Sequence, residues 1–407
     1  MNFLKYNERT MNILFYTSWE VSPEQGGTER ITYTLAAELQ KTYNFKCFSI
    51  YNKPIRNPRK DTPFIESKQI ISDSFFEENL YQFIKKNKIN IIINQGNFES
   101  AEAICNAIQK YGSTKLLTVH HYSPGAEEKF LNCHNLIYNI QNKKNITRNI
   151  LLLILYPIAK LKKHYQIRTL YQKAYKYSDA VILLSEKFRD EFMRYAHISS
   201  SEKFHYIHNA LSFNYFFNMK DYNMKQKEVL IVSRLDEIYK RISIALNIWK
   251  EVEQLEDLKE WKLTIVGHGD EYKEKYQKQI SRLKLKRVSM QGLQDPTNYY
   301  KRASIFMMTS RSEGWGLTLT EAQQYGVVPL AFNSYSSLSD IITNNVNGII
   351  IPNNDTKEYI NKLIILMRND ELRKTLAQKA ISTSHRFETK KICEQWKDLL
   401  LKVSSQE

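Results

Sequence analysis

The chain has 407 residues, 42% of them hydrophobic, and a formal net charge of +16. A chain of this length can form two or three domains, and the absence of low-complexity tracts argues against a disordered protein. The four cysteines form no Cys-x-x-Cys pair and no Cys/His cluster, which argues against a disulfide framework or a zinc site and favours a reducing cytoplasm. The excess of positive charge predicts an anionic partner: nucleic acid, anionic lipid or a phosphorylated substrate.

The N-terminal residues predict neither a signal peptide nor a membrane span. The first ten residues are polar, and residues 11–16 predict a first strand, so a native start at Met11 stays open. The longest apolar run, 150–159, has about ten residues, whereas a transmembrane helix needs roughly 20.

Short apolar runs alternate with helical segments through the first half of the chain. Each run is followed by polar residues or glycine, and residues 31–41 place their apolar side chains on one helical face. The runs predicted as strands are 13–17, 45–50, 89–94, 115–119 and 180–185. This alternation is typical of βαβ units in a parallel, doubly wound α/β sheet.

A second series of the same kind follows the polar linker 221–228. Its predicted strands are 229–233, 261–266, 288–291, 305–308, 327–331 and 348–351. Two α/β halves of about 200 residues each fit the usual size of a domain. We therefore predict one Rossmann-like domain over 1–222, a second over 223–385, and an amphipathic terminal helix within 386–407.

Two glutamates eight residues apart follow one of the second-half strands. Glu313 lies in a polar loop, and Glu321 lies in the first turns of a helix that begins near Leu317. Between them, Gly314 and Gly316 make backbone N–H groups approachable. Because helix starts attract phosphate and carboxylates bind vicinal hydroxyls, the segment suits a sugar nucleotide. A surface loop followed by an ordinary helix with two solvated acids is the alternative.

Two cations follow the first strand of the second half. Arg234 and Lys240 flank the turn into the next helix. Ligands of open parallel sheets bind beyond the carboxyl ends of the strands, so this pair is placed to hold a diphosphate and stabilise it as it leaves. A solvated basic helix start is the alternative. The chain has no Asp-x-Asp pair to hold a divalent cation, so we expect a metal-independent site without a cofactor.

Three further loops lie at predicted strand ends. Gly26 and Gly27 precede a helix and allow close approach to a phosphate or sugar, with a plain turn as the alternative. Gly267 opens a Gly-x-Gly that permits close approach by a nucleotide. His120 and His121 follow a strand, and one of them could reach a substrate, while a structural histidine is the alternative.

The segment 142–177 combines aliphatic runs, tyrosines and cations. No Asp or Glu occurs between Lys129 and Ser178. An apolar face with tyrosine anchors and a cationic face suits a helix lying in an anionic membrane surface. A long core helix with a solvated basic side is the alternative. Since aliphatic runs suit lipid better than a phosphate backbone, we expect a membrane partner and no nucleic acid.

Taken together, these motifs resemble family 4 of the retaining glycosyltransferases, with the GT-B fold and of the glycosyltransferase group 1 type. The resemblance covers nearly the whole chain. It is carried by Glu-x7-Glu at Glu313 and Glu321, the Arg…Lys motif within 233–241, Val-Gly-x-Gly at 266–269 and Gly-Gly-x-Glu-Arg at 26–30. Ser233, Arg241 and Trp315 stand where the family more often has Gly, Gly and Phe, which leaves the identity of the donor open.

The resemblance implies two Rossmann-like domains facing each other across a cleft, an N-terminal one for the acceptor and a C-terminal one for the donor. The terminal helix would pack back on the N-terminal domain. Glu313 would bind hydroxyls of the donor sugar, Glu321 the ribose, and Arg234 with Lys240 the diphosphate. The other implied donor contacts are Gly26, Gly27, Gly267, Gly314, Trp315, Gly316 and Leu317. His120 or His121 would contact the transferred sugar, with a slight preference for His120, which directly follows the strand.

The implied reaction is a retaining transfer of a sugar from a nucleotide-diphosphate sugar to a saccharide or lipid-linked saccharide. The implied setting is bacterial envelope polysaccharide or glycolipid synthesis, in the cytoplasm at the inner face of the membrane. The alternatives are a nucleic-acid-binding protein, a DNA-modifying glucosyltransferase and a GT-B sugar-nucleotide epimerase. The donor sugar, the nucleotide base, the acceptor, the linkage and the oligomeric state are not identified by the sequence.

Overall fold

The computed structural model describes residues 10–405 except 57–60, 72–73, 111 and 142–143. The question of a native start at Met11 therefore concerns residues that lie almost entirely outside the described ones. The chain divides into two compact units, Met1–Ser212 with Thr389–Glu407, and Phe213–Glu388. The domain limits at 222 and 385 stay predictions from the sequence.

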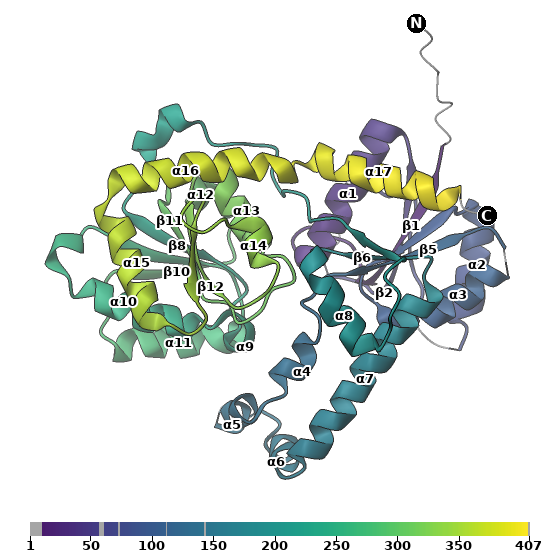
Figure 1. Cartoon of the computed structure of the whole chain (residues 1–407), viewed down its shortest axis with the longest axis horizontal. Coiled ribbons are helices and arrows are strands. Elements are labelled where there is room, and N and C mark those ends of the chain that lie inside the picture. The colour runs from purple at the N-terminus through teal and green to yellow at the C-terminus, as the bar shows by residue number, and fades with distance from the viewer. Residues whose placement is uncertain (1–9, 57–60, 72–73, 111, 142–143, 406–407) are drawn as a thin grey trace, which may run out of the picture. The chain divides into compact units, whose positions relative to one another are not determined.

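The first unit is built on a seven-stranded parallel sheet in the order β3-β2-β1-β4-β5-β6-β7 (Figure 1). Its strands are β1 (Asn12–Trp19), β2 (Lys46–Lys53), β3 (Ser67–Gln69), β4 (Ile91–Asn94), β5 (Lys115–His120), β6 (Ala180–Leu183) and β7 (Phe204–Tyr206). The central β4 is buried along its length, as expected for a parallel strand covered on both faces. The chain order reverses on either side of β1, so the loops after β1 and β4 diverge to opposite faces and leave a crevice where ligands of such sheets bind.

Nine α-helices are described in the first unit. They are α1 (Gly27–Tyr43), α2 (Phe76–Asn87), α3 (Ala101–Gln109), α4 (Ala126–Phe130), α5 (Cys133–Gln141), α6 (Ile146–Ile154), α7 (Tyr156–Tyr177), α8 (Arg189–Ala196) and α17 (Thr389–Ser404). The terminal helix α17 buries Ile392, Trp396 and Leu400 and packs beside α1 (Figure 1). The amphipathic pattern predicted for this helix is thus matched by its buried face.

The second unit has a six-stranded parallel sheet in the order β10-β9-β8-β11-β12-β13. Its strands are β8 (Glu228–Val232), β9 (Lys262–Val266), β10 (Val288–Gly292), β11 (Ile305–Met308), β12 (Val328–Asn333) and β13 (Ile349–Pro352). Its α-helices are α9 (Glu237–Lys240), α10 (Ile242–Glu253), α11 (Asp270–Arg282), α12 (Thr297–Arg302), α13 (Leu317–Gln324), α14 (Leu338–Ile341), α15 (Thr356–Arg368) and α16 (Asp370–Ser384). Here the order reverses at β8, which has β9 on one side and β11 on the other.

The predicted α/β class with parallel sheets is confirmed, and every predicted strand overlaps an observed one. Two strands, β3 and β7, are not predicted by the sequence. Each has three residues, and β3 is exposed throughout, so neither presents an apolar run. Both lie at the outer edges of the sheet, where a strand needs little apolar surface.

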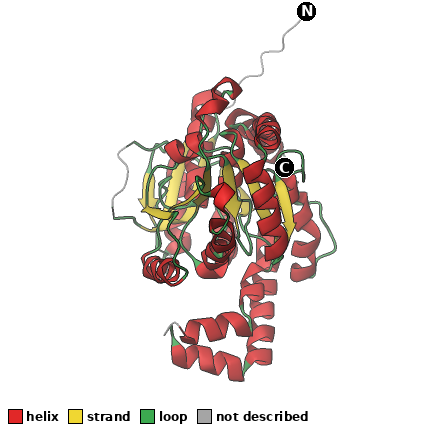
Figure 2. Cartoon of the chain, turned by 90° about the vertical axis from the view of Figure 1, so that its left-hand side faces the viewer, coloured by secondary structure: helices red, strands yellow, loops and turns green. Residues whose placement is uncertain are grey.

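The segment 142–177 forms two helices, with residues 142–143 outside the described ones. The helical structure is interrupted between α6 and α7, and Pro157 occupies the first turn of α7. Together α4, α5, α6 and the first half of α7 form a projection from the first unit, which we call the arm (Figures 1 and 2). The second half of α7 buries Ile167, Tyr171 and Ala174 instead. The core-packing alternative thus holds for the second half of α7, while membrane binding by the rest of the segment stays a prediction.

Candidate functional site

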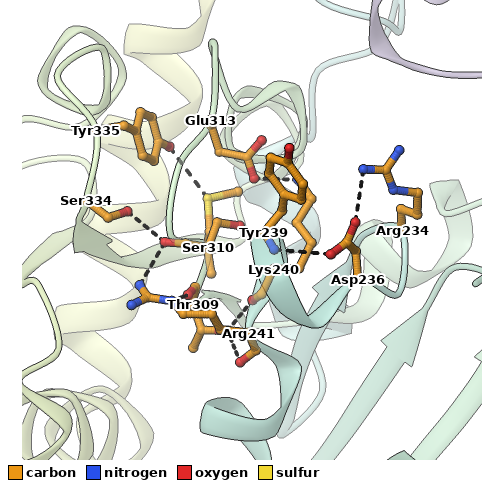
Figure 3. A network of polar contacts seen from close by, with 11 residues as sticks. Arg234, Asp236, Tyr239, Lys240, Arg241, Thr309, Ser310, Glu313, Ser334 and Tyr335 are labelled. Atoms are coloured by element: carbon orange, nitrogen blue, oxygen red, sulfur yellow. Dashed lines mark hydrogen bonds and ion pairs between the residues drawn. The ribbon is translucent and has the colours of Figure 1, made fainter. Parts of the chain in front are cut away.

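The first part of the site follows β8 in the second unit. Asp236 caps the short helix α9, accepting hydrogen bonds from the backbone N–H groups of Ile238 (3.0 Å) and Tyr239 (3.2 Å). Its second carboxylate oxygen lies 3.3 Å from Nη2 of Arg234 (Figure 3). The Arg234 side chain is 62% exposed. Asp236 therefore fixes the helix start while Arg234 keeps donors open to a ligand.

The predicted cation and carboxylate meet beyond the ends of β8 and β11. Nζ of Lys240 lies 2.5 Å from Oε1 of Glu313, and both side chains are largely buried, with 19% and 14% exposed (Figure 3). Ser233, Thr309 and Thr318 line the same small depression. The reversal of strand order at β8 explains this meeting, because it puts the loops after β8 and β11 next to each other.

A helix start lies directly beyond Glu313. Gly316 precedes α13 with φ +98, a left-handed conformation that favours glycine. A Cβ at Gly316 would lie 2.9 Å from the Tyr335 hydroxyl, so space also requires glycine here. The carbonyl of Gly314 accepts a hydrogen bond from the Ser337 hydroxyl (3.0 Å). The loop is thus held in a form that presents the first N–H groups of α13, beginning at Leu317, which have no partner within the helix.

Glu321 is fully buried one turn further along α13. Its Oε2 accepts a hydrogen bond of 2.9 Å from the hydroxyl of Tyr300, which is also fully buried. Tyr300 stacks on Tyr325 with ring centroids 5.6 Å apart. The carboxylate is therefore held by an aromatic layer below the surface, and Tyr300 is a residue that the sequence did not single out.

Trp315 and Gly267 have structural explanations in this unit. The ring of Trp315 is buried edge-on against Phe387, with centroids 5.2 Å apart. Gly267 has φ +144, and a Cβ there would lie 1.8 Å from the carbonyl oxygen of Ser233. Gly269 has φ +154 and a similar conflict with the carbonyl of Leu235. The Gly-x-Gly sequence is required because the loops after β9 and β8 run backbone against backbone.

The two adjacent histidines of the first unit differ in their surroundings. His120 ends β5 inside an aromatic cage, stacked on Phe98 at 5.1 Å, with Tyr171 and Phe192 edge-on at 5.2 and 5.6 Å. His121 is also buried, but it reaches the loop after β4, where its Nε2 lies 2.5 Å from Oε1 of Gln95.

These surroundings set the protonation of both rings. Burial lowers the pKa of His120 to about 3, with a smaller contribution from His121, and burial lowers the pKa of His121 to about 4. Both are neutral at physiological pH. Nδ1 of His121 has no hydrogen-bond partner in the part of the chain that the structure describes, whereas Nε2 of His120 lies 3.4 Å from the Tyr171 hydroxyl. His121 thus keeps a buried ring nitrogen without a partner among the described residues, and the slight preference of the sequence for His120 stays a prediction.

Gly26 and Gly27 lie at the start of α1, after β1. Gly26 has extended backbone (φ −177), which any residue adopts, and a Cβ there would meet Oε2 of Glu29 at 2.8 Å. That contact is with the end of a flexible side chain. The fold itself therefore does not require glycine at position 26, and close approach of a ligand to Gly26 and Gly27 stays a prediction.

The structure thus has two Rossmann-like sheets. In the second unit, Arg234, Lys240 and Glu313 cluster where the strand order reverses at β8. A family model described as "Glycosyl transferases group 1" matches residues 215–383, and one described as "Glycosyltransferase Family 4" matches residues 25–214. Between them they cover most of both units. The chain belongs to the glycosyltransferases of the group 1 type, as predicted, whereas its placement among the retaining enzymes of family 4 stays a prediction.

Individual proteins are similar over part or all of the chain. The amylovoran biosynthesis glycosyltransferase AmsD of Erwinia amylovora is 30% identical over 48% of this chain and 53% of its own length. An α-1,4-N-acetyl-D-galactosaminyltransferase of Campylobacter jejuni, named for a saccharide on PP-undecaprenol, is 23% identical over 44% of this chain and 50% of its own. The chain thus spans about half the length of these relatives.

A solved structure matches the whole fold. Anabaena Alr3699/HepE in complex with UDP and glucose aligns with a TM-score of 0.71 and 16% identity, covering 96% of this chain and all of that one. At this identity the likeness concerns the fold alone. It confirms the predicted GT-B fold.

Proposed function

We propose that the protein is a retaining glycosyltransferase that moves a sugar from a nucleotide-diphosphate sugar to a saccharide or lipid-linked saccharide. The observation that carries the proposal is the ion pair of Lys240 with Glu313, beside the exposed Arg234 at the strand-order reversal. A cation pair and a carboxylate at two neighbouring strand ends suit the diphosphate and the sugar of the same donor.

In the proposed reaction, Arg234 and Lys240 bind the diphosphate and stabilise the charge that grows on it as the bond to the sugar breaks. Lys240 then shares its N–H donors between the phosphate and Glu313, and Glu313 accepts hydrogen bonds from the sugar hydroxyls. The N–H groups of the first turn of α13 add partial positive charge near phosphate. Glu321 accepts from the ribose. The acceptor attacks on the face that the diphosphate leaves, and the diphosphate oxygen takes its proton, so the configuration at the anomeric carbon is retained.

Residues of the first unit also contribute to the proposed reaction. His121, held by Gln95, or His120 contacts the transferred sugar, and Gly26 and Gly27 approach the diphosphate. A neutral imidazole can donate one hydrogen bond and accept another, so it suits a hydroxyl better than a phosphate. We expect the charge stabilisation to come from Arg234 and Lys240 without a divalent metal.

The acceptor class is supported by the relatives, since one is named for amylovoran biosynthesis and another for a saccharide on PP-undecaprenol. The donor class is supported by the fold likeness to a protein with bound UDP and glucose. We therefore expect a saccharide acceptor of the bacterial envelope and place the enzyme in the cytoplasm at the inner face of the membrane.

The test begins with a thermal-shift screen of UDP, GDP, ADP and their sugars, because a ligand that binds only the folded state raises stability by RT ln(1 + [L]/Kd). Transfer to saccharide acceptors is then followed by NMR, which reports the anomeric configuration. A Lys240→Ala variant should lose turnover. Lys278→Ala is the matched control, since Lys278 also pairs with a glutamate, Glu274, but on the exposed side of α11. An inverted product would refute retention, and conversion of the donor to its epimer without transfer would favour the epimerase.

We also propose that the protein binds anionic membranes through the segment 142–177, and the arm is the part that supports this. None of the helices in the described ranges combines the length and apolar composition needed to cross a bilayer. Large apolar side chains nevertheless stay exposed on the arm: Ile137, Ile146, Ile150, Leu151, Ile154, Leu155, Ile158, Leu161 and Tyr165. Lys160 and Lys162 are exposed among them. An exposed apolar surface with cations and no carboxylates between 130 and 177 matches an anionic lipid surface.

A liposome-pelleting assay tests the membrane proposal. Lys163 is a poor choice for substitution because it pairs with Glu127 within the arm. Replacing Lys160 and Lys162 by Glu should release the protein, because each cation near an anionic surface contributes about 1 kcal/mol. The matched control places the same charge change on two exposed lysines of α16, Lys374 and Lys379. Equal pelleting of both variants, or equal binding to neutral and anionic vesicles, would refute the proposal.

A further inference from the structure

Arg241 occupies a position that its backbone makes unfavourable. It joins α9 to α10 with φ +51, in the left-handed region that favours glycine. This explains why glycine is the more usual residue after the lysine in the family pattern. An arginine there adds conformational strain, so its side chain has to offset that cost by the contacts it makes.

The Arg241 side chain is buried, and its guanidinium binds the end of β11. Nε donates to the carbonyl of Thr309 (2.7 Å) and Nη2 to the carbonyl of Ser310 (2.9 Å), as Figure 3 shows. The amide oxygens of Asn354 (2.6 Å) and Asn353 (3.2 Å) accept the remaining bonds. The guanidinium also lies over the ring of Phe332, 5.2 Å from its centroid.

Groups of the loop after β11 in turn donate hydrogen bonds to carbonyls of the loop after β8. The Thr309 hydroxyl lies 3.0 Å from the carbonyl of Lys240 and 3.1 Å from that of Arg241, and donates to this pair of oxygens. The backbone N–H of Arg311 donates to the carbonyl of Tyr239 at 2.7 Å. The two loops that carry Lys240 and Glu313 are therefore joined directly behind that ion pair.

The geometry of the contacts favours arginine over lysine. All four acceptors are neutral oxygens, and within the described residues Arg241 forms no ion pair with a carboxylate. Burial lowers the pKa of Arg241 to about 10, with a smaller contribution from Arg311, so the group stays a cation at neutral pH. A lysine would present all its N–H donors from one nitrogen, whereas the four acceptors of Arg241 are bonded by three separate nitrogens of a planar fork.

We propose that Arg241 is a positioning residue that fixes the separation of Lys240 and Glu313 by joining the loop after β8 to the loop after β11. Its effect on turnover rests on the proposed function. The two donor-binding groups come from different loops, so their separation depends on this connection. A misplacement of about 1 Å in such a site can lower turnover roughly 100-fold.

The test compares Arg241→Lys and Arg241→Gly with Arg373→Lys. Glycine relieves the backbone strain while removing the side chain, so it separates the two effects. Arg373 is the matched control because it is a buried arginine of the same unit that donates to the carbonyls of Leu366 and Met367 and lies over Trp261. It contacts none of the site loops.

Hydrogen exchange followed by mass spectrometry tests the connection between the loops after β8 and β11, and it needs no substrate. Both Arg241 variants should exchange at least about tenfold faster over 309–316 than the parent, whereas Arg373→Lys should not. The substrate for the turnover assay is the sugar of the nucleotide, UDP, GDP or ADP, that stabilises the parent. With this substrate, kcat should fall roughly 10- to 100-fold in the Arg241 variants, with a smaller change in KM. The Arg373→Lys variant should show no such fall.

Two results would overturn the inference. One is equal exchange over 309–316 in Arg241→Lys and Arg373→Lys. The other is loss of kcat in proportion to thermal stability in all three variants, which would make Arg241 an ordinary core residue. A parent protein that binds no nucleotide would instead refute the proposed function and the effect on turnover, while the exchange comparison would still decide whether Arg241 joins the loops.

Discussion

The two glutamates of the site should fail in different ways when each is replaced by alanine. Glu313 is 14% exposed and paired with Lys240, so it can turn to a sugar hydroxyl. Glu321 is fully buried and bonded to Tyr300. In the proposed complex, Glu313→Ala removes contacts to the reacting sugar, and Glu321→Ala removes contacts to the nucleotide. We therefore expect the first to lower kcat and the second to weaken nucleotide binding.

The size of each effect follows from the contacts. A hydrogen bond to a charged group contributes about 1.5–3 kcal/mol, which corresponds to roughly 10- to 150-fold in kcat for Glu313→Ala or in Kd for Glu321→Ala. The Glu321 variant also leaves the buried Tyr300 hydroxyl without this acceptor, at a cost of about 1–3 kcal/mol in unfolding free energy. Tyr300→Phe removes only the donor of that bond, so it reports on how far Tyr300 orients Glu321.

The assays are calorimetric titration with nucleotide, steady-state transfer and urea unfolding of the same samples. Tyr300→Phe should weaken nucleotide binding less than Glu321→Ala does. If Glu321→Ala lost stability but bound nucleotide like the parent, Glu321 would be a structural residue. If Glu313→Ala turned over donor normally, the assignment of the whole loop would be wrong.

Three further results are expected. Transfer should continue in EDTA, since Arg234 and Lys240 supply the positive charge, and activity lost in EDTA but restored by manganese would contradict this. The unfolding free energy should fall as pH drops from about 6.5 towards 4, because the unfolded histidines take up protons there while His120 and His121, with pKa values of about 3 and 4, stay neutral. A His120→Phe variant should show a shallower fall in urea titrations, and an unchanged slope would remove this explanation. Gly267→Ala should prevent stable folding, because its Cβ would lie 1.8 Å from a carbonyl oxygen. Gly292→Ala, at φ +72 with open space around it, should lose only about 1 kcal/mol of unfolding free energy. Similar melting temperatures for the two variants would refute the steric argument.

Most strands could be predicted because their residues are buried on both faces. A run such as 91–94, with three isoleucines, has few alternatives to a central parallel strand. The exposed edge strand β3, with the sequence Ser-Lys-Gln, carries no such signal, since its backbone pairing with β2 creates the strand. The segment 142–177 was ambiguous for a related reason. Apolar side chains, tyrosines and cations occur in both the exposed arm and the buried end of α7, and only packing separates the two parts.

The sequence by itself determined the chemical types of the candidate site residues and their places at strand ends. Local rules suffice for this, because a polar loop after an apolar run lies at the carboxyl edge of a parallel sheet. The family also followed from the spacing of the motifs, while the donor-binding roles of individual residues stay predictions.

Tertiary structure decided which of these residues meet. Lys240 and Glu313 are 73 positions apart, and they pair because the strand order reverses at β8 and brings β11 beside it. The same packing brings Arg241 to the carbonyl of Thr309. It also brings the Tyr300 hydroxyl to the carboxylate of Glu321. Contacts between segments distant in sequence arise from the order of strands and the space between loops, and neither is encoded in a local pattern of residues.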